Sequence, residues 1–157
     1  MSRADLSRSA CTLARAAEIV GDAWTQVILR ELFLGARRFD DIQRATGASP
    51  HLLSQRLKRL EAEGVVARRA YSARPPRRDY RLTERGLDLW PVIVALKTWG
   101  DRWLGDGAPP PVSLTHIACG RPTAPRLTCS ECGERLGARD CRADLSEAML
   151  RERGAAR

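Results

Sequence analysis

Hydrophobic residues near the start of the chain recur every three or four positions, which is the spacing of one face of an α-helix. Residues 11–20 carry a sparse set of them, and residues 24–34 carry a denser set that is typical of a buried helix. Asp22 precedes the second stretch as a candidate N-cap, because its carboxylate can accept free amide protons of the first turn. Gly35 ends it. The pattern predicts two helices.

A short apolar repeat and a better-marked one come next. The stretch RRFDDIQRATG, residues 37–47, predicts a short helix that stops at Gly47. In SPHLLSQRLKRLEAEG, Ser49 is a good N-cap, Pro50 fits the first helical position and Gly64 closes the end. The apolar stripe of this helix is formed by Leu53, Leu57 and Leu60. Two helices joined by a glycine-containing turn predict a helix-turn-helix.

A strand pattern follows Gly64 directly. Residues 65–72 predict a strand, and residues 79–82 predict its returning partner. Between them, residues 73–78 predict a basic tip that Pro75 and Pro76 keep out of regular pairing. Together these elements predict a mainly α fold with a small β-hairpin wing, the winged helix-turn-helix. In that arrangement the second helix enters the major groove and the wing rests on the adjacent backbone.

A long apolar stretch, residues 84–104, completes the first part of the chain. Thr83 is its predicted N-cap, and Pro91 is expected to kink it or divide it. A core of this size can hardly cover all of its tryptophans and aliphatic residues, so a second copy of the chain is the expected partner. The alternative is that the helix folds back on its own core. On this stretch, the predicted interface residues of the homodimer are Leu96, Trp99 and Trp103.

Positive charge is concentrated on the predicted helix-turn-helix and wing. The chain has a net charge of +8, and the segment 37–85 alone contributes +7. Compositional bias explains why arginine outnumbers lysine, but it does not explain the clustering. A basic stripe on one structural unit indicates double-stranded DNA as the partner. The candidate DNA-binding residues are Arg38, Ser49, His51, Ser54, Gln55, Arg56, Lys58, Arg59, Arg74, Arg77 and Arg78. For Arg56, at the edge of the apolar stripe, a phosphate or a carboxylate is the expected partner rather than a base.

The 157 residues suit one domain with an appendage. We expect a winged helix-turn-helix DNA-binding and dimerisation domain in residues 1–104, a linker in 105–113 and a cysteine-rich tail in 114–157. The start of the chain does not resemble a signal peptide, and no run is long and apolar enough to span a membrane. We therefore expect a cytoplasmic protein without a membrane partner. Five cysteines without an export signal favour metal ligands or redox chemistry over a disulfide scaffold.

The tail repeats one pattern, in which a ligand residue is followed by two residues, a cysteine and a glycine. HIACG and CSECG are its two versions. Such spacing is typical of zinc knuckles, where the glycine permits the tight turn that directs both side chains to one ion. The pattern predicts a small ribbon with a possible structural zinc, and a thiol pair that oxidises or plain packing are the alternatives. The predicted ligands are His116, Cys119, Cys129 and Cys132, with Cys141 as a rival fourth ligand.

The run from Cys11 to Trp103 resembles the HxlR-type family of bacterial winged helix-turn-helix transcriptional regulators. The segments EIVGDAWT, ILREL with RRFDDI, SPHLLSQRLKRLEAEG, YSARPPRRDYRLTERG and WGDRW carry the resemblance. It implies a homodimer held by the first helix, with Leu13 and Val20 as its interface residues, and by the long C-terminal helices, bound to an operator near a promoter. It also implies that Cys11, just before the first helix, is a candidate redox sensor. The alternative is an inert, buried thiol.

Enzymatic activity is not expected, because no acid–base or nucleophilic constellation is visible. The two histidines lie on the proposed recognition helix and in the cysteine tail. A protein-interaction adaptor built on a winged-helix scaffold and a zinc ribbon is the alternative function. The expected effector of the regulator is an oxidant or a small molecule.

Overall fold

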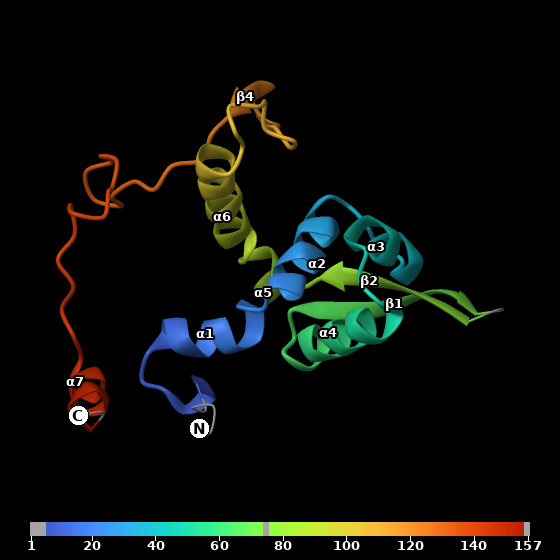
Figure 1. The fold of residues 1–157 in the computed structure, drawn as a ribbon, viewed down its shortest axis with the longest axis horizontal. Coiled ribbons are helices and arrows are strands. Elements are labelled where there is room, and N and C mark those ends of the chain that lie inside the picture. The colour runs from blue at the N-terminus through green and yellow to red at the C-terminus, as the bar shows by residue number, and fades with distance from the viewer. Residues whose placement is uncertain (1–5, 74–75, 156–157) are drawn as a thin grey trace.

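The computed structural model describes residues 6–73 and 76–155 (Figure 1). A single turn of 3₁₀-helix at Leu6–Arg8 precedes four α-helices. These are α1 (Thr12–Val20), α2 (Ala23–Phe33), α3 (Phe39–Thr46) and α4 (Pro50–Ala62). All four agree with the helices that the apolar spacing predicts.

Side-chain caps fix where the helices of the DNA-binding unit begin. The Asp22 carboxylate accepts the Thr25 amide proton at 3.0 Å, and the Ser49 hydroxyl accepts the Leu52 amide proton at 3.3 Å. Each bond satisfies a backbone donor that has no partner inside its own helix. Gly47 ends α3 in the left-handed conformation, with φ of 70°. A residue with a β-carbon would be strained there, so the glycine sets the turn between α3 and α4.

The core lies where α2, α3 and α4 meet the first strand. Leucines of α4 pack against α2 and against the residues that follow Gly64. The burial of these aliphatic side chains supplies the main stabilisation of the unit. The largest fully buried side chains are Ile28, Leu29, Leu32, Ile42, Leu53, Leu57, Leu60 and Val66, together with Thr25.

The wing is an antiparallel hairpin of β1 (Val66–Ala73) and β2 (Pro76–Leu82). Its register pairs Val66 with Leu82 at the base and Ala73 with Pro76 near the tip, and it is irregular between Ala70 and Ser72. The strands therefore run further than the predicted tip of residues 73–78 allows. Proline is tolerated here because a two-stranded ribbon has outer edges, where a missing amide donor costs no ladder hydrogen bond.

The predicted division at Pro91 is confirmed. Thr83 caps a short helix, α5 (Glu84–Leu87), and Pro91 lies in the first turn of α6 (Trp90–Trp103). A proline in the first turn removes no intrahelical hydrogen bond, so the chain can turn between the two helices before α6 begins. α6 then leaves the body of the molecule, with its first half against α2 (Figure 1).

The chain beyond α6 forms an extended C-terminal arm, residues 105–155 (Figure 1). The arm contains a small hairpin of β3 (Leu114–His116) and β4 (Arg121–Thr123), and it ends in a helix, α7 (Glu147–Ala155). The sequence reasoning did not predict α7. Its local signals are Ser146, whose hydroxyl accepts the Met149 amide proton, and the pair of Glu147 and Arg151 at helical spacing.

Candidate nucleic-acid interface

The solvent-facing side of α4 carries polar side chains suited to DNA. Ser49, His51, Gln55 and Lys58 are exposed and Ser54 is half-buried, while the leucines of the same helix are buried. Gln55 Nε2 lies 2.9 Å from His51 Nε2, so the two side chains form a connected polar surface one helical turn apart. Ser49, the N-cap, lies beside them at the start of the helix. In a helix-turn-helix, this end of the second helix faces the base edges.

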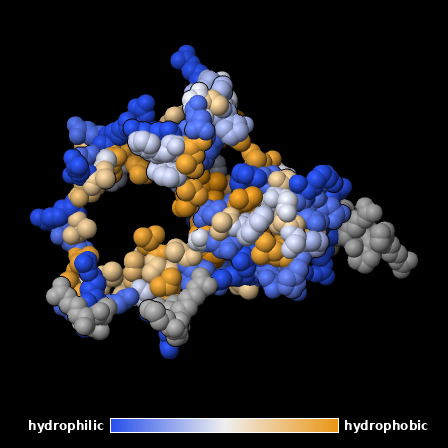
Figure 2. Space-filling model, in the orientation of Figure 1, coloured by the Kyte–Doolittle hydropathy of each residue, from blue (hydrophilic) through white to orange (hydrophobic). Residues whose placement is uncertain are grey.

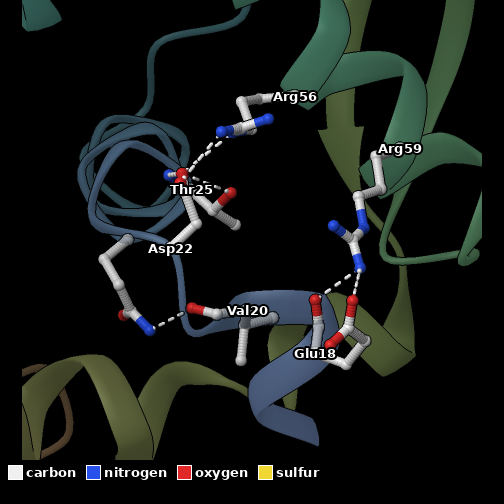
Figure 3. Close-up of polar contacts among 7 residues, drawn as sticks. Glu18, Val20, Asp22, Thr25, Arg56 and Arg59 are labelled. Atoms are coloured by element: carbon white, nitrogen blue, oxygen red, sulfur yellow. Dashed lines mark hydrogen bonds and ion pairs between the residues drawn. The ribbon is translucent and has the colours of Figure 1, made fainter. Parts of the chain in front are cut away.

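Arg56 binds a carboxylate of its own chain, one of the two partners that the sequence predicts for it. Its Nε and Nη2 atoms donate to the two oxygens of Asp22, each at 2.9 Å (Figure 3). This is the bidentate arrangement in which arginine and carboxylate groups hold each other most firmly. The Arg56 guanidinium, helped by the Thr25 amide, lowers the pKa of Asp22 below its ordinary value.

Arg59 is also directed towards the protein rather than outward. Its Nη2 atom donates to the backbone carbonyl of Glu18 and, at 3.2 Å, to the carboxylate of the same residue (Figure 3). The sequence pattern places Arg59 with the groove-facing residues, and the structure places its head group on the last turns of α1. The reason is that a long side chain at the edge of the polar face can reach a neighbouring helix that no sequence pattern positions.

The wing is joined to α4 by an ion pair that the sequence reasoning missed. Arg68 of β1 binds Glu61 near the end of α4, with a nitrogen–oxygen distance of 2.6 Å. Within β2, Arg81 binds Asp79 two residues before it at 2.8 Å, and Asp79 is buried. The two partners in the first pair lie seven residues apart across a turn. Only the orientation of the hairpin brings them together, so no local sequence signal could have identified the pair.

The remaining predicted cations have different positions. Arg78 lies on β2 opposite Ala70 and is exposed. Arg38 is exposed at the N-cap position of α3. Arg77 belongs to β2, but its side chain lies outside the described part of the structure, as does the whole of Arg74.

The predicted dimer residues fall into two groups. Leu13 of α1 and three residues of α6, Leu96, Trp99 and Trp103, are exposed. Val20 is only 8% exposed and belongs to the core of its own protomer, contrary to the predicted interface position. It lies at the end of α1 where the chain turns into α2, so it packs inward although it shares the helical spacing of Leu13.

A largely apolar cavity of about 520 Å³ lies between α2 and α6. Trp90 and Ile93 of α6 line it, together with Phe33 of α2 and Val112 and Leu114 of the arm. The DNA-binding unit and the start of the arm therefore both contribute to the wall of this cavity.

Cys11 occupies the N-cap position of α1 and is half-buried. Its amide donates to the Ser9 hydroxyl at 3.0 Å. The carboxylate of Glu152, on α7, accepts hydrogen bonds from the Ser9 hydroxyl at 2.7 Å and the Ala10 amide at 2.6 Å. These two bonds lower the pKa of Glu152 below its ordinary value. The end of the chain thus contacts the residues beside Cys11.

The two cysteine patterns of the tail form separate tight turns. In the first, His116 Nδ1 lies 3.3 Å from Cys119 Sγ, and Gly120 follows with φ of 66°. In the second, Gly133 has φ of 76°, and backbone amides together with the Cys132 thiol lower the pKa of Cys129. Among the residues that the structure describes, no three His, Cys, Asp or Glu side chains are placed so that they could hold one metal ion. The zinc ribbon as a single unit stays a prediction.

A helix-turn-helix with a hairpin wing and a polar recognition face defines a winged helix-turn-helix DNA-binding protein. The chain belongs to the HxlR-like helix-turn-helix family, whose sequence profile matches residues 19–108. It is therefore a transcriptional regulator and not an enzyme. Within the described residues, we find no helix that is both long and apolar enough to cross a membrane.

Known relatives cover different shares of the chain. The HTH-type transcriptional regulator Rv3095 of Mycobacterium tuberculosis, itself uncharacterized, is 46% identical over 129 residues, which are 82% of each protein. The crystal structure of PA1607, a candidate transcription factor, has a TM-score of 0.79 at 30% identity and covers 89% of this chain and 98% of its own. The redox regulator HypR in its reduced form has a TM-score of 0.56 at 28% identity, and its whole length covers 62% of this chain.

The contribution of the Asp22–Arg56 pair to the free energy of unfolding can be tested by mutation. Asp22→Ala removes both the cap of α2 and the partner of Arg56, so we expect the free energy of unfolding to fall by about 1–2 kcal/mol. Because folding depresses the Asp22 pKa, this contribution is present above the ordinary value of 3.8 and is lost as the pH falls through the folded pKa. Urea unfolding of both proteins between pH 7 and pH 3 measures the difference.

The matched control is Arg44→Ala, which removes an exposed ion pair with Asp41. Such pairs contribute little, so we expect a change within about 0.5 kcal/mol. Equal losses for the two variants would show that Asp22 has no special part in the fold.

Proposed function

We propose that this protein is a sequence-specific regulator that binds double-stranded operator DNA as a homodimer in the cytoplasm. The proposal rests chiefly on the polar outer face of α4, which lies beside a basic wing within a segment that carries +7 of the net charge. α4 enters the major groove, where His51, Ser54 and Gln55 reach base edges. Ser49, Lys58, Arg38 and the wing arginines contact phosphates.

The internal ion pairs refine this assignment. Arg56 and Arg59 hold α4 against α2 and α1, so their role in DNA binding is to position the helix. A displaced recognition helix would weaken contacts to bases and phosphates alike. Arg56 and Arg59 therefore have a positioning role, whereas the groove-facing residues of the same helix contact DNA directly.

Homodimerisation is supported by the exposed apolar face of α6. Val92, Leu96, Trp99 and Trp103 follow one another at helical spacing, and all four are exposed. Monomeric proteins rarely leave apolar patches of this kind uncovered. A two-fold dimer would also place two α4 helices for the two halves of a palindromic operator.

A protein-interaction adaptor is the weaker alternative. It would use the wing and the tail to hold other proteins and would need no phosphate-directed charge. The exposed Lys58 and Arg78, next to the uncharged polar groups of α4, favour DNA instead.

We also propose that reversible oxidation of Cys11 modulates DNA binding. HypR, a redox regulator, has a similar fold. Cys11 lies at the start of α1, and the exposed Leu13 follows two residues later, so a change at the thiol would act on the proposed dimer surface.

For the tail we propose a structural zinc ion between the two tight turns, with His116, Cys119, Cys129 and Cys132 as ligands. Support comes from the local geometry, since each ligand pair is followed by a glycine with positive φ. The structure does not gather the four side chains, so the two turns must approach each other to share an ion. Cys141, also exposed, is the rival fourth ligand, and a Cys129–Cys132 dithiol is the alternative.

Base reading and phosphate binding can be separated by mutation. On an operator selected from random fragments, Gln55→Ala should weaken binding by about 1–3 kcal/mol and leave random DNA nearly unaffected. Arg78→Ala should weaken binding to both DNAs similarly, with a shallower salt dependence. Fluorescence anisotropy across a salt series measures both effects.

The control is Gln43→Ala, the same change on α3, which should leave the preference for the operator intact. An equal loss of affinity on both DNAs for Gln55→Ala would contradict its assignment as a base-reading residue.

Thiol oxidation provides a test of Cys11. Hydrogen peroxide, which oxidises a thiolate to a sulfenic acid and is itself reduced to water, should lower operator affinity several-fold in the wild type, and a thiol reductant should restore it. The Cys11→Ser protein should bind with unchanged affinity under both conditions, whereas Cys141→Ser should respond like the wild type. An undiminished response of Cys11→Ser would exclude Cys11 as the sensor.

Metal analysis tests the zinc site. Protein purified under reducing conditions should contain one zinc ion per chain, and Cys129→Ser or Cys132→Ser should lose it. Cys141→Ser should keep it if His116 is the fourth ligand. A metal-free wild type that forms a Cys129–Cys132 disulfide on mild oxidation would instead support the dithiol.

A further inference from the structure

The C-terminal arm is ordered without a core of its own. None of its residues from 105 to 154 is buried, although the arm follows a defined path with a hairpin and a helix. Fixing the backbone of one residue costs about 1–2 kcal/mol of conformational entropy. A segment of this length must therefore bury surface elsewhere to hold its path. The exposed apolar residues available for this include Ile117, which is 97% exposed, and Leu127, Leu145 and Leu150.

The arm returns to the body of its own chain at α7. Glu152 binds the Ser9 hydroxyl and the Ala10 amide, immediately before α1. The arm, α1 and α6 therefore frame an opening through the molecule (Figure 2). Hydrophobic residues lie along the edges of this opening (Figure 2). A water-filled opening with apolar edges is unfavourable, so a further protein surface is needed to fill it.

The body side of the opening offers a matching surface. On α6, Trp90, Val94 and Lys97 face α2 and the cavity, whereas Trp99 and Trp103 lie on the opposite side of the helix. This second side is exposed, as is Leu13 on α1. The exposed side of α6 is the surface that the proposed homodimer uses, and it is continuous with the arm at Leu104, which is 69% exposed.

Charge and position favour a second copy over DNA as the occupant. The arm, residues 105–155, has seven basic and seven acidic residues and therefore no net charge, in contrast to +7 on residues 37–85. The arm and the wing lie on opposite sides of the molecule (Figure 1). The structural match to PA1607, at 30% identity, covers 89% of this chain, so it includes most of the arm. HypR corresponds to 62% of the chain, so the arm is an addition to the shared core.

We propose that the arm of each protomer embraces the second copy of the chain, whose α1 and α6 fill the opening, and that Glu152 closes the arm behind them. The inference rests on the proposed homodimer and adds a second contact region to it. Two-fold symmetry makes the embrace mutual, so each apolar arm residue is buried twice per dimer. The apolar residues of the arm are then core residues of the dimer.

Photo-crosslinking of the full chain tests which copy the arm touches. Benzoylphenylalanine replaces Ile117 or Leu150, and the control carries it at Arg139, an exposed charged position of the arm. Irradiation should give covalent dimers from positions 117 and 150, with peptides of α1 or α6 in the cross-links, and few dimers from position 139. Cross-links confined to the same chain, or equally frequent from all three positions, would overturn the proposal.

Dimer affinity distinguishes this inference from the dimer itself. Analytical ultracentrifugation should show the dissociation constant rising about tenfold or more for Ile117→Asp or Leu150→Asp, because each change affects two buried sites. Arg139→Asp is the charge control and should have little effect. If the arm variants dimerise like the wild type while Leu96→Glu yields monomers, the homodimer stands and the embrace fails. A wild type that is monomeric at every concentration would refute both.

Discussion

The position of the recognition helix depends on one carboxylate. Asp22 caps α2 through the Thr25 amide and accepts two hydrogen bonds from Arg56 of α4, so a single side chain links the corner between α1 and α2 to the second helix of the helix-turn-helix. Bidentate pairing fixes orientation as well as distance. The second link, from Arg59 to Glu18, lies on the same side of α4 (Figure 3). Buried leucines determine which face of α4 meets the core, and these arginines connect the helix to α1 and to the start of α2.

Because of these links, positive charge in the DNA-binding segment has two uses. Arg56, Arg59, Arg68 and Arg81 each pair with a carboxylate of the same chain. The solvent-facing part of α4 consequently has fewer unpaired cations than the sequence suggests, with Gln55 and its neighbours between Lys58 and the N-cap. Uncharged polar groups discriminate between bases, whereas cations mainly bind phosphates. The arrangement is therefore well suited to selective rather than merely tight binding.

The two ends of the molecule differ in how far their apolar side chains are buried. The winged-helix unit buries its aliphatic residues in one core, whereas α6 and the arm leave theirs exposed. A second copy that covers these residues would also fix the separation of the two α4 helices, which must match the spacing of operator half-sites. Assembly and DNA recognition would then be coupled through α6, which begins against α2 and ends at the arm.

Local rules determined most of the DNA-binding unit from the sequence alone. Apolar spacing, caps such as Ser49 and stops such as Gly47 depend on neighbours within a few residues, so the helix-turn-helix, the hairpin and the division at Pro91 could all be predicted. Contacts between distant segments could not. The inward position of Val20 and the ion pairs of Arg59 with Glu18 and of Arg68 with Glu61 are set by how whole elements pack, and helical periodicity carries no information on that packing.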